Sequence, residues 1–393
     1  MGVGVTAPGI LISSGDPSGA MHAARLARAV IERTGAKMFG LGTEAMSQAG
    51  VELVGDASEI AVIGLSEALE LLPRAWRLLN RLEAEAARRR PRLAILVDSP
   101  DFNLRLGARL KRLGIRVVYF IGPQAWAWRS GRVRRIREIV ERMLVIFPFE
   151  EKFYREAGVE AEFIGHPLFD RVTPDASPAE FRRRQALDPD APILAMLPGS
   201  RRKELAHNLP AMTQAVGLLV SAGVPHQAIL AAAPGLAAGQ FRPYLAATPN
   251  IRVVEGATYD TLAAAECAIV SSGTATVEAA LLGTPMVVVY RVSAPSAFVL
   301  RRLVHTPFFS MVNLLLERPA VPELIQQEFT PERVARETRR LLERSEEREH
   351  MKSDLAEVRA RLASPSPLGA IGRAAEIISS LLWCAPDQAT PRV

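Results

Sequence analysis

Cysteine is nearly absent from this chain of 393 residues, which contains only Cys267 and Cys384. Two cysteines so far apart in sequence exclude a disulfide framework and suit a reducing compartment. No run of about 18 uncharged apolar residues occurs, so we expect no membrane-spanning helix. The first residues lack the basic and long apolar segments of a signal peptide. These absences predict a cytoplasmic location.

Several sequence motifs of enzymes and metal sites are also missing. The chain has no Walker A loop, which argues against ATP hydrolysis, and no G-x-S-x-G motif, which argues against acyl-serine chemistry. The six histidines are scattered, without an HExxH motif or a His/Cys cluster. We therefore predict no metal site.

Aromatic residues make up only 6% of the chain, whereas hydrophobic residues make up 49%. The interior must therefore consist mainly of Ala, Leu, Val and Ile, which suits a layered α/β protein. The net charge of +6 favours an anionic partner, although solvated arginine-rich helix faces would give the same composition. Because no nucleic-acid-binding motif accompanies the spread of arginines, we expect no nucleic acid partner.

Short apolar runs alternate with helical patterns along the chain. The runs are not interrupted by alternating polar residues, which is typical of parallel strands buried on both faces. The predicted strands are Ile10–Ser13, Leu93–Val97, Val117–Ile121, Met143–Ile146, Glu162–Ile164, Ile193–Leu197, Gln227–Ala232, Ile251–Glu255, Ala268–Val270 and Met286–Val289. In the first half, helices are expected near residues 18–33, 103–113, 132–140 and 150–157.

A turn-rich stretch from Gly165 to Pro178 separates two such series. The pattern predicts an α/β protein with two Rossmann-like, doubly wound parallel-sheet domains and a cleft between them. We assign residues 1–168 to the first domain, 169–345 to the second and 346–393 to a charged helical tail.

In open α/β sheets, ligands bind at the carboxyl ends of the strands. The first predicted strand leads into the loop Ser13–Gly19, where Ser18 is the expected helix cap and the backbone N–H groups favour an anion. An ordinary strand–helix turn explains this loop equally well. After the next predicted strand, Asp101 or Asn103 is the expected helix cap. Asp98 has no such structural duty and is a candidate general base.

Three further loops carry candidate ligand-binding residues. Trp126, Trp128 and Arg129 follow a first-half strand and would either anchor the next helix or line an acceptor site. In the second half, two small-residue loops suit a nucleotide sugar, since backbone donors and a guanidinium bind diphosphate and a carboxylate can bind ribose. These loops contain Gly199, Ser200, Arg201, Ser272, Gly273, Thr274 and Glu278.

Together, these motifs resemble the lipid-A-disaccharide synthase family, and the resemblance extends from about residue 10 to residue 330. The segments that carry it are Ser14–Gly19, Asp98–Asn103, Pro123–Arg129, Pro148–Glu150, Gly165–Leu168, Leu197–Arg201, Ser272–Glu278 and Pro322–Gln326. The resemblance implies a GT-B fold whose tail returns toward the first domain. It also implies a metal-independent, inverting transfer from UDP-2,3-diacylglucosamine to 2,3-diacylglucosamine 1-phosphate, a step of lipid A synthesis in Gram-negative bacteria. No cofactor is expected, and a homodimer is one further expectation.

The resemblance also implies roles for individual residues. Asp98 is the preferred candidate base for the acceptor 6-hydroxyl, and Asp16 stands where the family has Glu. Arg201 with Gly199 and Ser200 would hold the diphosphate, and Glu278 the ribose. Ser272, Gly273, Thr274, Asn313 and Gln326 would lie near the donor. Those expected to face the acceptor or the reacting sugars are Ser18, Gly19, Trp126 and Arg129.

Two departures from the family pattern keep alternatives open. The usual Gly-Glu-Ala-Ser-Gly-Asp loop ends here in Ala20, so a catalytically silent UDP-sugar-binding paralogue is one alternative. The usual Ser-Leu-Pro-Asn is Ser310–Asn313, which leaves room for a different acceptor or acyl-chain preference. A UDP-sugar 2-epimerase, or another transferase of the same fold, is a further alternative.

An apolar stretch flanked by arginines spans residues 61–90. Basic residues beside an apolar helix face suit an anionic membrane surface, which predicts a peripheral location on the inner face of the inner membrane. A core-packed helix with a solvated basic face explains most of the helix slightly better, whereas the diacylated substrate implied by the resemblance favours the membrane for its start. The residues expected to touch the membrane are Val62, Ile63, Leu65, Leu69, Leu72 and Trp76.

Overall fold

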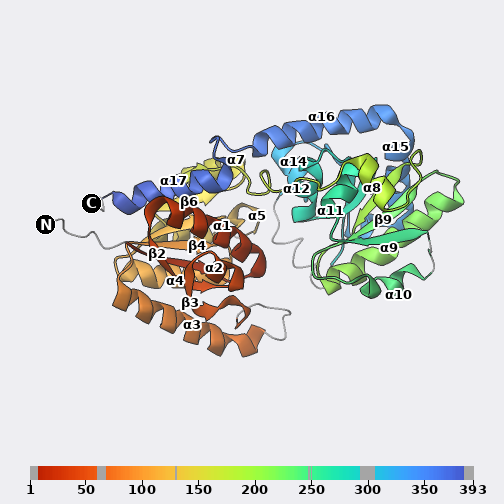
Figure 1. Cartoon of the computed structure of the whole chain (residues 1–393). Helices are drawn as coiled ribbons and strands as arrows, with labels where there is room; N and C mark the ends of the chain where they lie inside the picture. Colours follow the sequence, from red (N-terminus) through yellow and green to blue (C-terminus); the bar gives the residue numbers. More distant parts are fainter. Residues whose placement is uncertain are drawn as a thin grey trace. The chain divides into compact units, whose positions relative to one another are not determined.

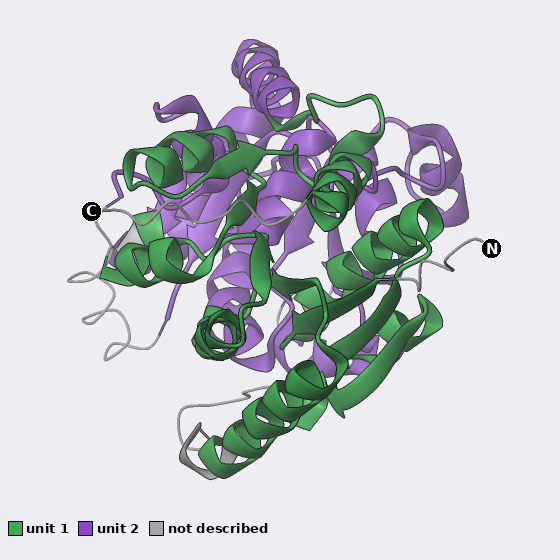
Figure 2. Cartoon of the chain, turned by 90° about the vertical axis from the view of Figure 1, so that its left-hand side faces the viewer, with its two compact units in different colours: residues 1–167, 362–393 green, residues 168–361 purple. Residues whose placement is uncertain are grey.

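The computed structural model describes residues 8–59, 68–128, 131–246, 248, 250–292 and 306–384. The chain forms two compact units (Figure 2), unit 1 with residues 1–167 and 362–393 and unit 2 with residues 168–361. In the structure, the expected tail of residues 346–393 divides: nearly all of α16 (Ser345–Leu362) falls in unit 2, and α17 (Gly369–Trp383) falls in unit 1.

Unit 1, in which Figure 1 labels β2, β3, β4 and β6, is built on a seven-stranded parallel sheet with the order β3-β2-β1-β4-β5-β6-β7. Its strands are β1 (Gly9–Ser14), β2 (Lys37–Gly42), β3 (Val51–Asp56), β4 (Leu93–Val97), β5 (Arg116–Phe120), β6 (Arg142–Val145) and β7 (Ala161–Phe163). The strand order reverses between β1 and β4. This topological switch point is where doubly wound folds bind ligands.

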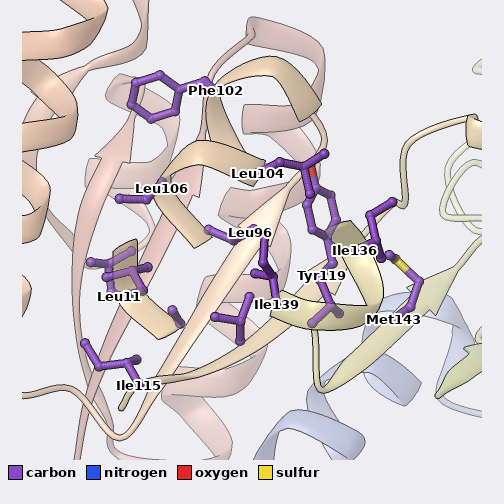
Figure 3. Close-up of a cluster of buried hydrophobic side chains, with 14 of the residues drawn as sticks. Leu11, Leu96, Phe102, Leu104, Leu106, Ile115, Tyr119, Ile136, Ile139 and Met143 are labelled. Atoms are coloured by element: carbon purple, nitrogen blue, oxygen red, sulfur yellow. The ribbon is translucent and has the colours of Figure 1, made fainter. Parts of the chain in front are cut away.

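Helices cover both faces of this sheet, and successive residues of each central strand enter opposite cores. Leu11, Leu96 and Tyr119 belong to the core beneath α3, α4 and α6, shown in Figure 3. Ile12 and Val97 belong to the core beneath α1, α2 and α17. The helices of unit 1 other than α17 are α1 (Pro17–Thr34), α2 (Glu44–Gln48), α3 (Ala68–Arg89), α4 (Pro100–Arg112), α5 (Ala125–Trp128), α6 (Gly131–Ile139) and α7 (Pro148–Glu156).

Unit 2 repeats this topology with a six-stranded parallel sheet of the order β10-β9-β8-β11-β12-β13. Its strands are β8 (Ile193–Leu197), β9 (Gln227–Ala232), β10 (Ile251–Glu255), β11 (Cys267–Ser271), β12 (Met286–Tyr290) and β13 (Glu323–Ile325). The helices that the structure describes in this unit, besides α16, are α8 (Pro178–Arg184), α9 (Arg202–Ser221), α10 (Arg242–Leu245), α11 (Thr258–Ala264), α12 (Thr274–Leu281), α14 (Met311–Leu316) and α15 (Pro331–Glu343). The switch point of unit 2 lies between β8 and β11.

The prediction of two Rossmann-like parallel sheets is confirmed, and every predicted strand exists within one residue of its expected ends. Strands β2, β3 and β13 were not predicted. Two predicted helix caps are wrong. Asp16, not Ser18, caps α1, and the residue at the start of α4 is Ser99 rather than Asp101 or Asn103.

Candidate active site

The switch point of unit 1 brings together the loops that follow β1 and β4. The two strands are hydrogen-bonded neighbours, so Asp16 and Asp98 follow adjacent strand ends. Asp16 Oδ1 accepts a hydrogen bond from Gly19 N at 2.8 Å. A Cβ atom at Gly19 would lie 2.9 Å from Ser14 Oγ and 3.3 Å from Asp98 Cβ. Glycine at position 19 therefore lets the start of α1 approach the Asp98 side chain closely.

A buried asparagine fixes the two loops to each other. Asn103 Nδ2 donates to the carbonyl oxygens of Ser13 (3.3 Å), Val97 (2.9 Å) and Asp98 (2.8 Å), and Asn103 Oδ1 accepts from Ser13 Oγ at 2.8 Å. Both polar atoms of this amide therefore form hydrogen bonds, and together they connect the end of β1 to the end of β4. Sequence reasoning expected a cap here, because an Asn near a helix start most often serves as one.

The Asp98 carboxyl is electrostatically unusual. Burial and, second to it, the negative charge of Asp16 together raise the pKa of Asp98 to about 6. The backbone at Asp98 (φ 48°) and Ser99 (φ 45°) is left-handed, a conformation that costs free energy for non-glycine residues and is concentrated at functional sites. A carboxyl that titrates close to neutrality is suited to accept a proton from a hydroxyl.

Asp98 lines a cavity of about 240 Å³ within unit 1. Arg132 and Glu150 also line it, together with the Gly122–Ala125 segment after β5. Glu150 is buried, and its carboxylate accepts from Trp126 Nε1 at 3.0 Å and from Phe147 N at 3.2 Å. Burial raises the pKa of Glu150 to about 7, against the lowering effect of these hydrogen bonds.

Sequence reasoning did not identify Glu150 or Arg132 as site residues. Both follow strands of the sheet at a distance of several residues, so only the fold places them at the cavity. Trp126, the predicted acceptor contact, is half-buried and hydrogen-bonded to Glu150. Arg129 lies outside the described residues, as does the side chain of Ser18.

The switch point of unit 2 brings together the loops after β8 and β11. Gly199 has a φ of 116°, which favours glycine, and it precedes Ser200 and Arg201 at the start of α9. The Glu204 carboxylate accepts from Ser200 N at 2.9 Å and from Arg201 N at 3.3 Å. It also lies 3.5 Å from the Arg201 guanidinium, whose side chain is 82% exposed. An internal carboxylate thus contacts the same donors that were predicted to hold a diphosphate.

A second buried asparagine joins these loops. Asn208 Nδ2 donates to Pro198 O at 2.9 Å and to Ser271 Oγ at 3.0 Å, which connects the end of β8 to the end of β11. The role of Asn208 was not predicted, because a single polar residue inside a long helix belongs to no recognisable sequence motif. Its position on the buried face of α9 was the available signal.

The remaining predicted donor residues lie at or near this edge of unit 2. Glu278 is half-buried and accepts from Tyr259 OH at 3.0 Å, and burial raises its pKa. Ser272 Oγ donates to Phe309 O at 3.4 Å, and Gly273 has a φ of 143°. Thr274 begins α12 directly after this glycine.

Asn313 and Gln326 make contacts with the backbone. Asn313 Nδ2 donates to Val321 O at 2.9 Å and to Glu323 Oε1 at 2.8 Å, while its Oδ1 accepts from two backbone N–H groups. With its amide oriented to satisfy both polar atoms, Gln326 pairs with Val292 N (3.1 Å) and Val292 O (3.3 Å). These bonds shape the loops of unit 2, and a role of either residue in donor binding stays a prediction.

The predicted membrane segment is described only in part. In α3, Leu72 and Trp76 are 52% and 58% exposed, and the Arg109 guanidinium lies 4.4 Å from the centre of the Trp76 ring. Leu78 and Leu82 on the same helix are buried in the core. Val62, Ile63, Leu65 and the side chain of Leu69 lie outside the described residues.

Two absences hold for the part of the chain that the structure describes. No helix there combines the length and the apolar character that crossing a bilayer requires. No group of three or more His, Cys, Asp or Glu side chains there is placed to hold a metal ion.

The family model of lipid-A-disaccharide synthetase matches residues 10–367. The chain belongs to this family. It is 45% identical over 380 residues to the lipid-A-disaccharide synthase of Myxococcus xanthus (strain DK1622), covering 95% of this chain and 98% of that protein. The synthase of Solibacter usitatus (strain Ellin6076) is 43% identical over 376 residues, with coverages of 95% and 98%.

Solved structures show which fold this family member has. The glycotransferase of kitacinnamycin superposes with a TM-score of 0.64 at 17% identity, covering 96% of this chain and 99% of that chain. The UDP-GlcNAc 2-epimerase from Neisseria meningitidis, bound to UDP-GlcNAc, superposes with a TM-score of 0.60 at 12% identity, covering 95% and 99%. At these identities the likeness establishes the GT-B fold alone.

The structure shows where Ala20 lies, the residue that stands in place of the usual Asp of the family loop. Ala20 is fully buried in the core beneath α1, and its N–H group donates to Asp16 O at 2.9 Å. Position 20 therefore adds no carboxylate to the pair formed by Asp16 and Asp98.

Proposed function

We propose that this protein joins UDP-2,3-diacylglucosamine to 2,3-diacylglucosamine 1-phosphate, releasing UDP and the β-1,6-linked disaccharide 1-phosphate. Membership of the lipid-A-disaccharide synthetase family supports this reaction. The observation that carries it is the position of Asp98, which directly follows the central strand β4 at the switch point and lines a cavity of about 240 Å³.

In the proposed mechanism, Asp98 accepts the proton of the acceptor 6-hydroxyl as that oxygen attacks the anomeric carbon of the donor. Burial and the neighbouring charge of Asp16 keep the pKa of Asp98 at about 6, so the carboxylate is ionised at pH 7 and still basic enough to help. Attack from the face opposite the UDP leaving group inverts the configuration at the anomeric carbon.

The unit 2 loops would bind the UDP portion of the donor. Arg201 and the backbone N–H groups of Ser200 and Arg201 can offset the negative charge that grows on the departing diphosphate. For this to happen, Glu204 must release the N–H groups that it contacts in the structure. Glu278, at the same edge, is proposed to bind the ribose hydroxyls.

We also propose that the protein binds peripherally to the inner face of the inner membrane, where its diacylated substrates reside. The exposed Leu72 and Trp76 on α3, close to exposed arginines such as Arg74 and Arg77, support this location. Pelleting with anionic liposomes should weaken as salt rises. Equal pelleting with neutral liposomes at high salt would contradict an electrostatic contribution.

The reaction is tested by incubating the purified full-length protein with both lipid substrates and identifying the products by mass spectrometry. We expect the disaccharide 1-phosphate and UDP in equal amounts, and far less disaccharide from Asp98→Asn at the same protein concentration and time. In a parallel sample, UDP-GlcNAc without acyl chains should remain unchanged by NMR. Conversion of UDP-GlcNAc to its C2 epimer, or UDP binding without turnover of any sugar, would replace the proposed function with one of the two alternatives.

A further inference from the structure

The cavity beside Asp98 contains a single positive charge among its described lining residues. That charge is the guanidinium of Arg132, on α6. The other ionisable groups that line the cavity are the carboxyls of Asp98 and Glu150. Among the described lining residues, Arg132 is therefore the side chain whose charge can attract an anionic ligand.

The Arg132 side chain is not part of the hydrophobic core. The buried face of α6 consists of Val133, Ile136 and Ile139, which pack beneath the sheet. The Arg132 side chain is 19% exposed and forms an ion pair with Asp101, whose own side chain is 81% exposed. An ion pair with such an exposed partner contributes little to stability, so another anion can replace Asp101 at small cost.

Arg132 is also linked to the backbone of Asp98 through Tyr119. It acts electrostatically on Tyr119, and the Tyr119 hydroxyl donates to Asp98 O at 2.5 Å. One cavity thus contains both a proton acceptor, Asp98, and a guanidinium that can bind an anion, Arg132.

We propose that Arg132 binds the anomeric phosphate of the acceptor and so selects phosphorylated over unphosphorylated acceptors. This inference rests on the proposed function, in which Asp98 receives the proton of the acceptor 6-hydroxyl. The planar guanidinium can donate two parallel hydrogen bonds to phosphate oxygens, and Asp101 stands in for the phosphate while the acceptor is absent. The acceptor then enters with its phosphate toward Arg132 and its 6-hydroxyl toward Asp98.

The test compares two acceptors that differ only in the phosphate, 2,3-diacylglucosamine 1-phosphate and 2,3-diacylglucosamine. Arg132→Gln should raise the KM for the phosphorylated acceptor about 10- to 100-fold, the range expected for a lost hydrogen-bonded charge contact. It should leave the KM for the unphosphorylated acceptor and the KM for the donor unchanged. Arg132→Lys keeps the positive charge but not the planar pair of N–H donors. Its KM for the phosphorylated acceptor should therefore lie between those of wild type and Arg132→Gln.

Arg135→Gln is the matched control, because Arg135 lies on the same helix and is exposed. It should leave the preference between the two acceptors as in wild type. If Arg132→Gln raises both acceptor KM values equally, Arg132 acts through the shape of the protein and the proposal is overturned. An unchanged preference in Arg132→Gln would overturn it as well.

A binding experiment separates this inference from the proposed function. Glucosamine 1-phosphate and glucosamine are titrated into the full-length protein and followed by NMR, which requires no turnover. We expect saturable binding of the phosphate compound to wild type and to Arg135→Gln, and loss of that binding in Arg132→Gln. Such binding without any disaccharide formation would contradict the proposed function and leave the phosphate site standing. If the protein forms the disaccharide but Arg132→Gln binds glucosamine 1-phosphate as well as wild type does, the proposed function stands and the phosphate site at Arg132 is overturned.

Discussion

The two units share a topology and differ in what their switch points present. In unit 1 a buried Asn103 joins the ends of β1 and β4, and in unit 2 a buried Asn208 joins the ends of β8 and β11. Beside the first bridge lie the carboxyls of Asp16 and Asp98, and beside the second lie backbone N–H groups and Arg201. The same scaffold therefore carries carboxyls at one switch point and N–H and guanidinium donors at the other, and we propose that the first accept a proton and the second bind an anion, as expected when loops rather than folds determine chemistry.

The largest effect should come from removing the proton acceptor. Asp98→Asn keeps the size of the side chain but cannot take the proton, so kcat should fall about 10²- to 10⁴-fold. The KM for the donor should change little, because the donor is assigned to unit 2. Steady-state kinetics with both lipid substrates measures this, and near-normal kcat in Asp98→Asn would remove Asp98 as the base.

Glu150→Gln should change how stability depends on pH. The pKa of Glu150 is raised from 4.5 to about 7 in the folded protein, so its stabilising contribution is present below pH 4.5 and is lost as pH rises through 7. This group therefore lowers the free energy of unfolding by about 3 kcal/mol across that window. Chemical denaturation at several pH values should show a flatter profile for Glu150→Gln.

The control for this prediction is Glu156→Gln on the same helix, since Glu156 is exposed and only weakly paired with Lys152. Its profile should match that of wild type. A Glu150→Gln profile as steep as that of wild type would show that Glu150 is not the group whose ionisation destabilises the fold.

Replacing the two bridging asparagines should change different kinetic constants, the KM for the donor in unit 2 and kcat in unit 1. Asn208→Leu leaves Pro198 O and Ser271 Oγ without their buried donor and should raise the KM for the donor about tenfold. Asn103→Leu should instead lower kcat, because it loosens the loop that carries Asp98. Identical kinetic changes in both variants would mean that the bridges only stabilise the protein.

The smallest effect concerns the coupling of Asp16 to Asp98. Because the base must be ionised, kcat/KM should fall as pH drops through about 6 in wild type. Asp16→Asn removes the charge that raises the pKa of Asp98, so the acidic limb should move to lower pH. Activity at pH 7 should change little and activity at pH 5 should rise relative to it. An unshifted limb would show that Asp16 does not influence the base.

Much of this architecture could be predicted from the sequence. The central strands were found because their apolar runs, such as Leu93–Val97, are buried on both faces. Strands β2 and β3 were missed because glycines interrupt them, at Gly40 and Gly42 in β2 and at Gly55 in β3, and glycine has a low strand propensity. Strand β13 was missed because it is only three residues long.

The candidate site was predictable where a recognisable polar or small-residue loop follows a strand, as the loops that carry Asp98 and Arg201 do. It was not predictable where residues from separate elements meet. Arg132 and Glu150 lie on different helices, α6 and α7, and only the packing of those helices brings both to one cavity. The Glu204 contact had a local signal, because a Glu at the third position of a helix commonly bonds the N–H group at its start.

The central claim is that unit 1 carries the base and unit 2 binds the donor. It is tested most directly by measuring both UDP affinity and turnover in Asp98→Asn and in Arg201→Ala. Isothermal titration calorimetry with UDP is performed on wild type, Asp98→Asn and Arg201→Ala, and each protein is also assayed for disaccharide formation. We predict that both variants lose turnover, that Asp98→Asn binds UDP as wild type does, and that Arg201→Ala binds it at least tenfold more weakly. Undiminished UDP binding in Arg201→Ala, or lost binding in Asp98→Asn, would contradict the assignment of the base to unit 1 and of the donor to unit 2.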